Sequence, residues 1–134
     1  MKAERKNRRI MTQKLLKIVM LCADQDFENI FRRILADYKL EVISGFDLTR
    51  NIAACWERIC RSRFDILILT NFGISAYDMI ECVKLLPENR GYRAVVMTGH
   101  LDLEMANVCI EKNVPLAKFP LEAEEIRALV SGRQ

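Results

Sequence analysis

Residues 64–75 read FDILILTNFGIS, and an uninterrupted aliphatic run stands at the centre of this stretch. The four residues from Ile66 to Leu69 are all apolar, with no alternation between apolar and polar positions. Such a strand is typically buried on both faces, as in a parallel sheet that helices cover on each side. Thr70 ends the run, and the segment from Asn71 to Asp78 is expected to be a loop. We therefore predict that Thr70 lies at the carboxyl end of a buried strand.

Four further short runs, rich in β-branched or aliphatic residues, are spaced along the rest of the chain. They cover residues 17–22, 41–44, 94–98 and 115–119. Segments with helical spacing of apolar residues lie between the runs. In the first of these, Phe27, Ile30 and Phe31 belong to one apolar stripe, and either Asp24 or Asp26 is placed to cap that helix. Strand and helix alternate five times without an internal linker. The pattern predicts an α/β fold, a doubly wound (βα)5 three-layer sandwich around a parallel five-stranded sheet.

Composition and hydropathy narrow the class of protein. A length of 134 residues suits one domain with a real core. Hydrophobic residues make up 51% and charged residues 29%, which is typical of a globular protein. The longest apolar runs have five or six residues, whereas a membrane-spanning helix needs about 20. The chain begins without the apolar block of a secretory signal. We therefore expect a cytoplasmic protein with no membrane partner.

Cysteine and histidine usage argues against a metal centre. The chain has five cysteines and no Cys-x-x-Cys spacing, so we interpret them as small buried residues: Cys22, Cys55, Cys60, Cys82 and Cys109. His100 is the only histidine, which excludes a site built from several histidines and argues strongly against a His-based catalytic triad.

The positive charge is concentrated at the amino terminus. Residues 1–10 carry a local charge of +4, while the remaining 124 residues carry −1. We predict a basic N-terminal tail over residues 1–14 and one folded domain over residues 15–132. The tail lacks the aromatic residues that accompany many nucleic-acid contacts, so we interpret it as a solvated arm.

Several segments resemble, in their order and spacing, parts of one protein family. Residues 17–42 resemble its first strand and helix, 64–70 its third strand, 93–99 its fourth strand, and 118–126 the end of its fifth strand and the start of its last helix. Over residues 15–132 the chain is therefore similar to a response-regulator receiver domain, the flavodoxin-like module of two-component signalling. The resemblance implies a strand order of 2-1-3-4-5 and a functional site at the carboxyl ends of the strands.

The resemblance also implies which residues an active receiver needs. Two acidic residues after the first strand and the aspartate that accepts phosphate hold magnesium, while a hydroxyl residue and a lysine bind the phosphoryl oxygens. This chain has Cys22 and Ala23 in place of the acidic pair and Thr70 in place of the phosphoacceptor. A threonine hydroxyl is a weak nucleophile and a poor ligand for a hard cation. We interpret the chain as a degenerate receiver, or pseudo-receiver, with no catalytic residue, metal or cofactor, and not as an enzyme.

Four positions keep the residue types that the resemblance implies: Asp24, Thr98, Lys118 and Pro120. We expect Thr98, which ends the fourth strand, to restrain the next loop through a hydrogen bond. Phe119 lies between Lys118 and Pro120, so either Lys118 or Phe119 matches the lysine of the family. The family has a cis peptide bond before this proline, which implies a cis Phe119–Pro120 bond. In that register Phe119 takes the lysine position.

These observations lead to three functional hypotheses. The first is a stand-alone module of a bacterial two-component or phosphorelay-type pathway that binds another signalling protein, or a second copy of itself, without phosphorylation. The resemblance implies that the binding face consists of the fourth helix, fifth strand and fifth helix, here residues 102–111 and 122–133. The alternatives are a receiver that is phosphorylated on an atypical acceptor, and a nucleic-acid-associated regulator that acts through residues 1–10.

Overall fold

Five parallel strands form the centre of the molecule. The computed structural model describes residues 16–43 and 52–132, and the predicted tail, residues 1–14, lies outside this part. The elements in chain order are β1 (Lys17–Leu21), α2 (Gln25–Ile34), β2 (Lys39–Ile43), α4 (Ile52–Arg61), β3 (Ile66–Thr70), α5 (Ala76–Lys84), β4 (Arg93–Thr98), α6 (Leu103–Glu111), β5 (Leu116–Lys118) and α7 (Ala123–Ser131). The strand order is β2-β1-β3-β4-β5, with parallel pairing throughout. The predicted fold class and strand order are confirmed.

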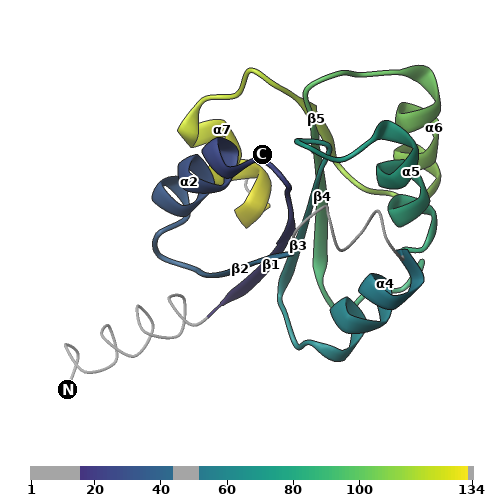
Figure 1. Ribbon diagram of the computed structural model, residues 1–134, viewed down its shortest axis with the longest axis horizontal. Coiled ribbons are helices and arrows are strands. Elements are labelled where there is room, and N and C mark those ends of the chain that lie inside the picture. Colours follow the sequence, from purple (N-terminus) through teal and green to yellow (C-terminus); the bar gives the residue numbers. More distant parts are fainter. Residues whose placement is uncertain (1–15, 44–51, 133–134) are drawn as a thin grey trace.

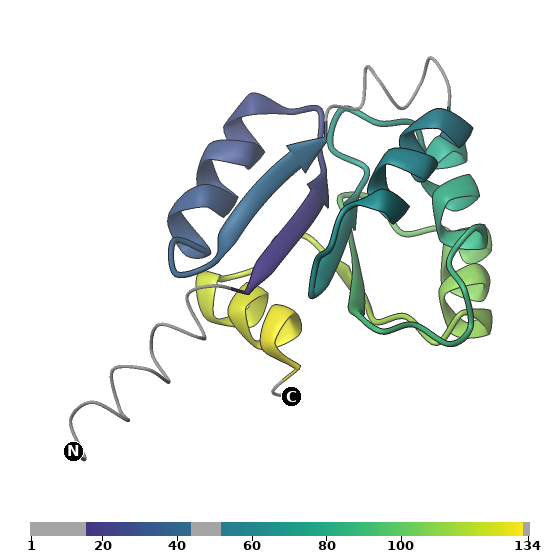
Figure 2. The same cartoon turned by 90° about the horizontal axis from the view of Figure 1, so that it is seen from below.

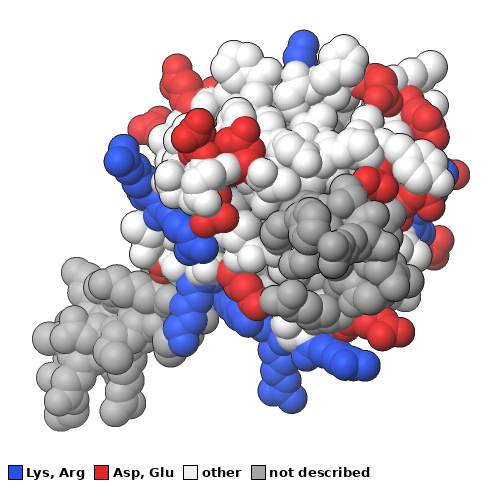
Figure 3. Space-filling model, in the orientation of Figure 1, with Lys and Arg blue, Asp and Glu red and all other residues white. Residues whose placement is uncertain are grey.

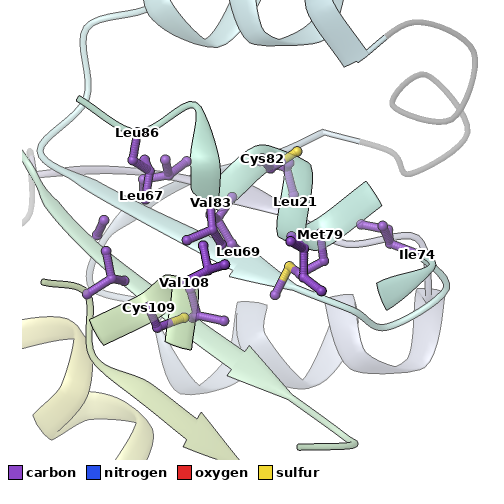
Figure 4. Packing of buried hydrophobic residues seen from close by; sticks show 14 of the residues in the cluster. Leu21, Leu67, Leu69, Ile74, Met79, Cys82, Val83, Leu86, Val108 and Cys109 are labelled. Carbon is purple, nitrogen blue, oxygen red and sulfur yellow. The ribbon is translucent and has the colours of Figure 1, made fainter. Parts of the chain in front are cut away.

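Helices cover both faces of the sheet, as Figures 1 and 2 show from two sides. Helices α2 and α7 lie on one face, and α4, α5 and α6 lie on the other. Successive residues of a strand point to opposite faces, so Val19 and Leu21 face one core while Ile18 and Met20 face the other. In the core on the α4–α5–α6 side, side chains from β3 pack against those from α5 and α6 (Figure 4). Because both faces are covered, the aliphatic run of β3 needs no polar alternation.

Strands β2 and β5 differ most in extent from the prediction, while β1 ends at Leu21 and β4 begins at Arg93, each one residue from the predicted bound. Strand β2 begins at Lys39, two residues before the predicted start, because the Lys39 amide donates to the Leu16 carbonyl at 3.0 Å. Strand β5 has three residues and is shorter than predicted. It pairs only with β4, at the edge of the sheet, and Pro120 offers no N–H to continue the ladder.

Most helices with a described start begin at an acidic or hydroxyl residue near the carboxyl edge of the sheet. Asp24 caps α2, since its Oδ1 atom accepts from the Asp26 amide at 2.9 Å and from the Phe27 amide at 3.1 Å, which decides between the two predicted caps. Ser75 and Asp102 cap α5 and α6 in the same way. These caps satisfy exposed amide groups at the positive ends of the helix dipoles.

The cysteines do not all lie in the core. Cys22, Cys82 and Cys109 are buried, as predicted, but Cys60 is exposed. The prediction is wrong for Cys60 because this residue lies in the last turn of α4, where its side chain lines a cavity open to solvent. The side chain of Cys55 lies outside the part of the chain that the structure describes.

No helix in the described part of the chain is long and apolar enough to span a membrane.

Candidate functional site

Thr70 ends β3 at the carboxyl edge, where doubly wound folds place their functional sites. Its side chain is fully buried. The Oγ1 hydroxyl donates a hydrogen bond of 2.6 Å to the Leu21 carbonyl of the neighbouring strand β1. The hydroxyl proton is therefore used to tie the ends of two central strands together. This contact is structural, and the Thr70 side chain is not exposed to solvent.

Cys22 lies directly beside Thr70 and is also buried, with 2% of its surface exposed. Its Sγ atom donates to the Asp24 carbonyl at 3.5 Å. Burial raises the pKa of the Cys22 thiol above its ordinary value of 9.0, against the smaller opposing effects of hydrogen bonds with the Asp24 backbone and the Thr70 side chain. The thiol is therefore protonated at neutral pH, and a protonated thiol is a weak nucleophile and a poor metal ligand.

The loop after β1 and the loop after β3 are in direct backbone contact. The Ala23 amide donates to the Phe72 carbonyl at 2.8 Å. The next residue, Gly73, has a φ of +76°, and a Cβ atom there would lie 2.8 Å from the carbonyl carbon and Cβ of Ala23. A glycine is required both by the positive φ and by the close approach. The two loops thus close over the strand ends at the positions that the resemblance assigns to carboxylates.

Four phenylalanine side chains fill the space on the α2 side of these loops. We call Phe27, Phe31, Phe72 and Phe119 the aromatic cluster. The rings of Phe27 and Phe72 are stacked, with centroids 3.7 Å apart and an interplanar angle of 2°. The Phe119 ring packs edge-on against both, at 5.5 and 4.9 Å, and against Phe31 at 6.1 Å. The cluster belongs to the core between the sheet and helices α2 and α7.

Phe119, which directly follows β5, packs into the aromatic cluster at this site. The Phe119–Pro120 bond is cis, as expected. Lys118 pairs with Thr98 in the sheet and has an exposed side chain, whereas the Phe119 ring is part of the aromatic cluster. This packing favours the alignment in which Phe119, and not Lys118, matches the lysine of the family. The Phe119 ring packs against the aromatic cluster, whereas the Lys118 side chain is exposed to solvent.

Thr98 and Asn71 organise the loop after β4. The Thr98 Oγ1 atom donates to the His100 carbonyl at 2.8 Å and accepts from the His100 amide at 3.2 Å. The predicted restraint on this loop is confirmed. Asn71, which the sequence reasoning did not single out, accepts from the Gly99 amide through Oδ1 at 2.9 Å. Its only signal in the sequence is its position directly after β3.

Two described aspartates at this edge, Asp24 and Asp102, are engaged in helix capping. Among residues 16–43 and 52–132, no three or more His, Cys, Asp or Glu side chains are grouped so that they could hold a metal ion. Asp24 is the carboxylate nearest in sequence to Cys22 and Ala23, and two amides of α2 already bind it. The described side chains at this edge therefore offer hydrogen bonds and apolar contact, and no set of hard oxygen ligands is found among them.

Comparison with known proteins identifies similar solved structures, and these are receiver domains. No family model matches the chain, and no curated protein matches it. It is similar to a CheY-like receiver domain protein from Methanospirillum hungatei, with a TM-score of 0.69 and 13% identity over 89% of this chain and 93% of that one. It is also similar to chemotaxis protein CheY4 from Vibrio cholerae, with a TM-score of 0.65 and 16% identity over 90% and 99% of the two chains.

A third similar structure is the beryllofluoride-activated receiver domain dimer of NtrC4, with a TM-score of 0.68 and 15% identity. The match covers 87% of this chain and 93% of that one. At such identities the likeness shows the fold. The chain therefore has the fold of CheY-like response-regulator receiver domains.

Proposed function

We propose that this chain is a receiver-like signalling module of a two-component or phosphorelay-type pathway, that it is not an enzyme, and that it acts by protein–protein interaction without phosphorylation. The observation that carries the proposal is the buried Thr70 hydroxyl, which is bonded to Leu21 where a receiver has its phosphoacceptor. Aspartyl phosphorylation needs a carboxylate nucleophile, magnesium on hard oxygen ligands and room for the phosphoryl group. Thr70, Cys22 and the aromatic cluster supply none of these.

Two exposed apolar side chains on α6 support a partner surface there. Leu103 and Ile110 are each 77% exposed, and a separation of seven residues places them on the same face of α6. Exposed apolar side chains are common singly, but two large ones on one helix face are typical of a contact surface. The face formed by α6, β5 and α7 is therefore where we propose that another signalling protein, or a second copy of this chain, binds.

The absence of phosphoryl chemistry is tested by NMR. Magnesium and beryllofluoride are titrated into the protein while amide shifts are recorded, with a receiver that has the full acidic set as positive control. We expect no saturable shifts at Cys22, Thr70 or Thr98. Saturable shifts at these residues would sink the proposal. The Thr70→Asp variant should likewise remain unphosphorylated by small phosphodonors, because the acidic pair is still missing.

The interaction surface is tested separately with charge substitutions. The double variant Leu103→Lys and Ile110→Lys should lose self-association or capture of the partner in a pull-down. Ile30→Lys is the matched control, since Ile30 is 46% exposed on α2, on the other face of the sheet. If the Ile30→Lys control lost binding while the double variant kept it, the partner surface would not lie on α6.

A further inference from the structure

The amino edge of the sheet, opposite the aromatic cluster, is hollowed. A cavity of about 660 Å³ lies there, and its walls include Lys17, Lys39, Arg63, Phe64, Asp65 and Tyr92. We call it the amino-edge pocket. Two further cavities, of about 500 and 540 Å³, adjoin it at Asp65. Small-molecule sites in proteins usually have volumes of about 300–1,000 Å³, so the amino-edge pocket is large enough for a nucleotide-sized ligand.

The charge of the amino-edge pocket is positive and only partly neutralised. The Lys17 ammonium group pairs with Glu41 at 3.0 Å, and the Asp65 carboxylate accepts from the Lys17 amide at 2.9 Å. Within the described part of the chain, Lys39 and Arg63 have no acidic side chain at ion-pair distance. Figure 3 shows Lys and Arg side chains gathered along the lower edge of the molecule. Two cations of the pocket thus remain available to an anion.

One wall of the amino-edge pocket is aromatic. The rings of Phe64 and Tyr92 lie with centroids 4.6 Å apart and an interplanar angle of 57°. Both side chains are half-buried and pack against the core on the α4–α5–α6 side, which holds them in place. Burial also raises the pKa of the Tyr92 phenol above 10.0, so its ring stays neutral at physiological pH. Aromatic walls of this kind stack on heterocyclic bases without needing a particular base.

We propose that the amino-edge pocket binds a nucleotide, with the phosphate on Lys39 and Arg63 and the base against Phe64 and Tyr92. A phosphate carries a charge of about −1.5 to −2 near neutral pH, and a guanidinium group matches two of its oxygens at once. The Phe64 and Tyr92 rings favour a nucleotide over inorganic phosphate, because only a ligand with a base can stack on them. This site is distinct from the α6 surface and from the carboxyl edge, so it extends the proposed function and does not depend on it.

Titration of the full chain with AMP, adenosine and inorganic phosphate tests the proposal. We expect AMP to bind saturably, with amide shifts at Lys17, Lys39, Phe64 and Tyr92, and both adenosine and phosphate to bind at least about tenfold more weakly. The Arg63→Gln variant should weaken AMP binding about tenfold. Arg61→Gln is the matched control. It removes the same charge two residues away, from an exposed side chain that pairs with Glu57 at 3.9 Å and does not line the pocket.

Four results would overturn the proposal. The first is no saturable binding of AMP at millimolar concentration. The second is phosphate binding as tightly as AMP, which would show that the rings contribute nothing. The third is equal weakening by Arg61→Gln and Arg63→Gln, which would indicate a diffuse charge effect. The fourth is loss of binding in the full-length Arg8→Gln, Arg9→Gln variant with no shifts at the pocket, which would assign binding to the basic tail. Lys39 and Arg63 are exposed, so their substitution does not threaten folding.

Discussion

The two edges of the sheet differ in how their polar groups are used. At the carboxyl edge, Thr70, Thr98 and Asp24 each bind backbone groups nearby, and the aromatic cluster fills the adjacent space. At the amino edge, a cavity of about 660 Å³ remains, and Lys39 and Arg63 line it without an acidic partner among the described residues. Among the described residues, Thr70, Thr98 and Asp24 bond to the chain itself at the edge where such folds ordinarily place their sites, whereas a cavity remains at the amino edge.

Helix direction explains part of this difference. In a parallel α/β fold the helices begin near the carboxyl edge, where their positive dipole ends attract acidic caps such as Asp24 and Asp102. The carboxylates of Asp24 and Asp102 are thereby used in capping. The amino edge receives the helix ends and the strand starts, where basic side chains are favoured. Substitutions at the carboxyl edge should therefore lower the free energy of unfolding more than those at the amino edge. We expect the largest loss at Thr70.

Thr70→Asp should cause the largest loss of stability, because it buries a carboxylate beside the Leu21 carbonyl. A buried carboxyl has a raised pKa, and a rise of about three units costs about 4 kcal/mol at neutral pH. The loss should be small below about pH 4, where the carboxyl is protonated in both states, and should grow as pH rises from there up to the folded-state pKa. Urea denaturation at pH 4 and pH 7 measures it. Thr70→Val, which removes only the hydrogen bond, should cost about 1 kcal/mol. Equal stability of the two variants at pH 7 would show that the edge is open to water.

Phe72→Ala tests whether the aromatic cluster closes the carboxyl edge. Phe72 is 7% exposed and stacks on Phe27, so its removal should lower the free energy of unfolding by about 3 kcal/mol. Chemical denaturation of the variant measures the loss. Tyr77→Ala is the control, since Tyr77 is 69% exposed and should change stability by no more than about 0.5 kcal/mol. Similar effects in the two variants would mean that the rings do not form a packed unit.

Gly73→Ala tests the contact between the two loops at the same edge. The substitution places a Cβ atom 2.8 Å from Ala23 on a residue with a φ of +76°, and we expect a loss of about 2 kcal/mol. Thermal unfolding followed by circular dichroism reports the change. Gly91→Ala, on the amino edge, places its Cβ atom where nothing lies within 4 Å, so the protein should be unchanged or slightly more stable. A tolerated Gly73→Ala would show that the loops can separate.

The smallest effect should come from the buried thiols. The folded-state pKa of Cys22 is raised above 9.0 by burial, and burial raises the pKa of Cys109 to about 11. Above pH 9 the unfolded chain loses thiol protons that the folded chain keeps, so stability is full below pH 9 and falls as pH rises, by about 1 kcal/mol at pH 10. Denaturation curves from pH 7 to pH 10 measure the fall. It should be reduced in Cys109→Ala and unchanged in Cys60→Ala.

Alkylation at neutral pH compares the solvent accessibility of one cysteine at each edge. Cys60 is exposed and lines the amino-edge pocket, whereas Cys22 is buried at the carboxyl edge. Iodoacetamide should modify Cys60 and leave Cys22 unmodified in the folded protein, as peptide mass spectrometry would show. Modification of both cysteines at similar rates would contradict the burial of Cys22 at the carboxyl edge.

The sequence alone determined the fold class, and its resemblance to receiver domains added the strand order and the positions at which carboxylates were expected. Uninterrupted aliphatic runs such as Ile66 to Leu69 require burial on both faces, and the alternation with amphipathic helices leaves few topologies. The residue types at positions 22, 23 and 70 already lack the carboxylates that magnesium requires. The fold class rests on residue type and local spacing, which can be read without knowing distant contacts, whereas the strand order and the site positions rest on the resemblance.

Only the tertiary structure decided what occupies the space at that edge. Phe27, Phe72 and Phe119 are far apart in the sequence, and their stacking depends on segments from α2, the loop after β3 and the end of β5 meeting at one place. The choice between Lys118 and Phe119 was likewise left open until packing showed which side chain points inward. Nothing in the sequence indicated that the amino-edge pocket brings together Lys39, Arg63 and Tyr92. These residues come from β2 and from two separate loops. Contacts between distant segments follow from how the sheet and helices pack, and residue type and local spacing do not contain that information.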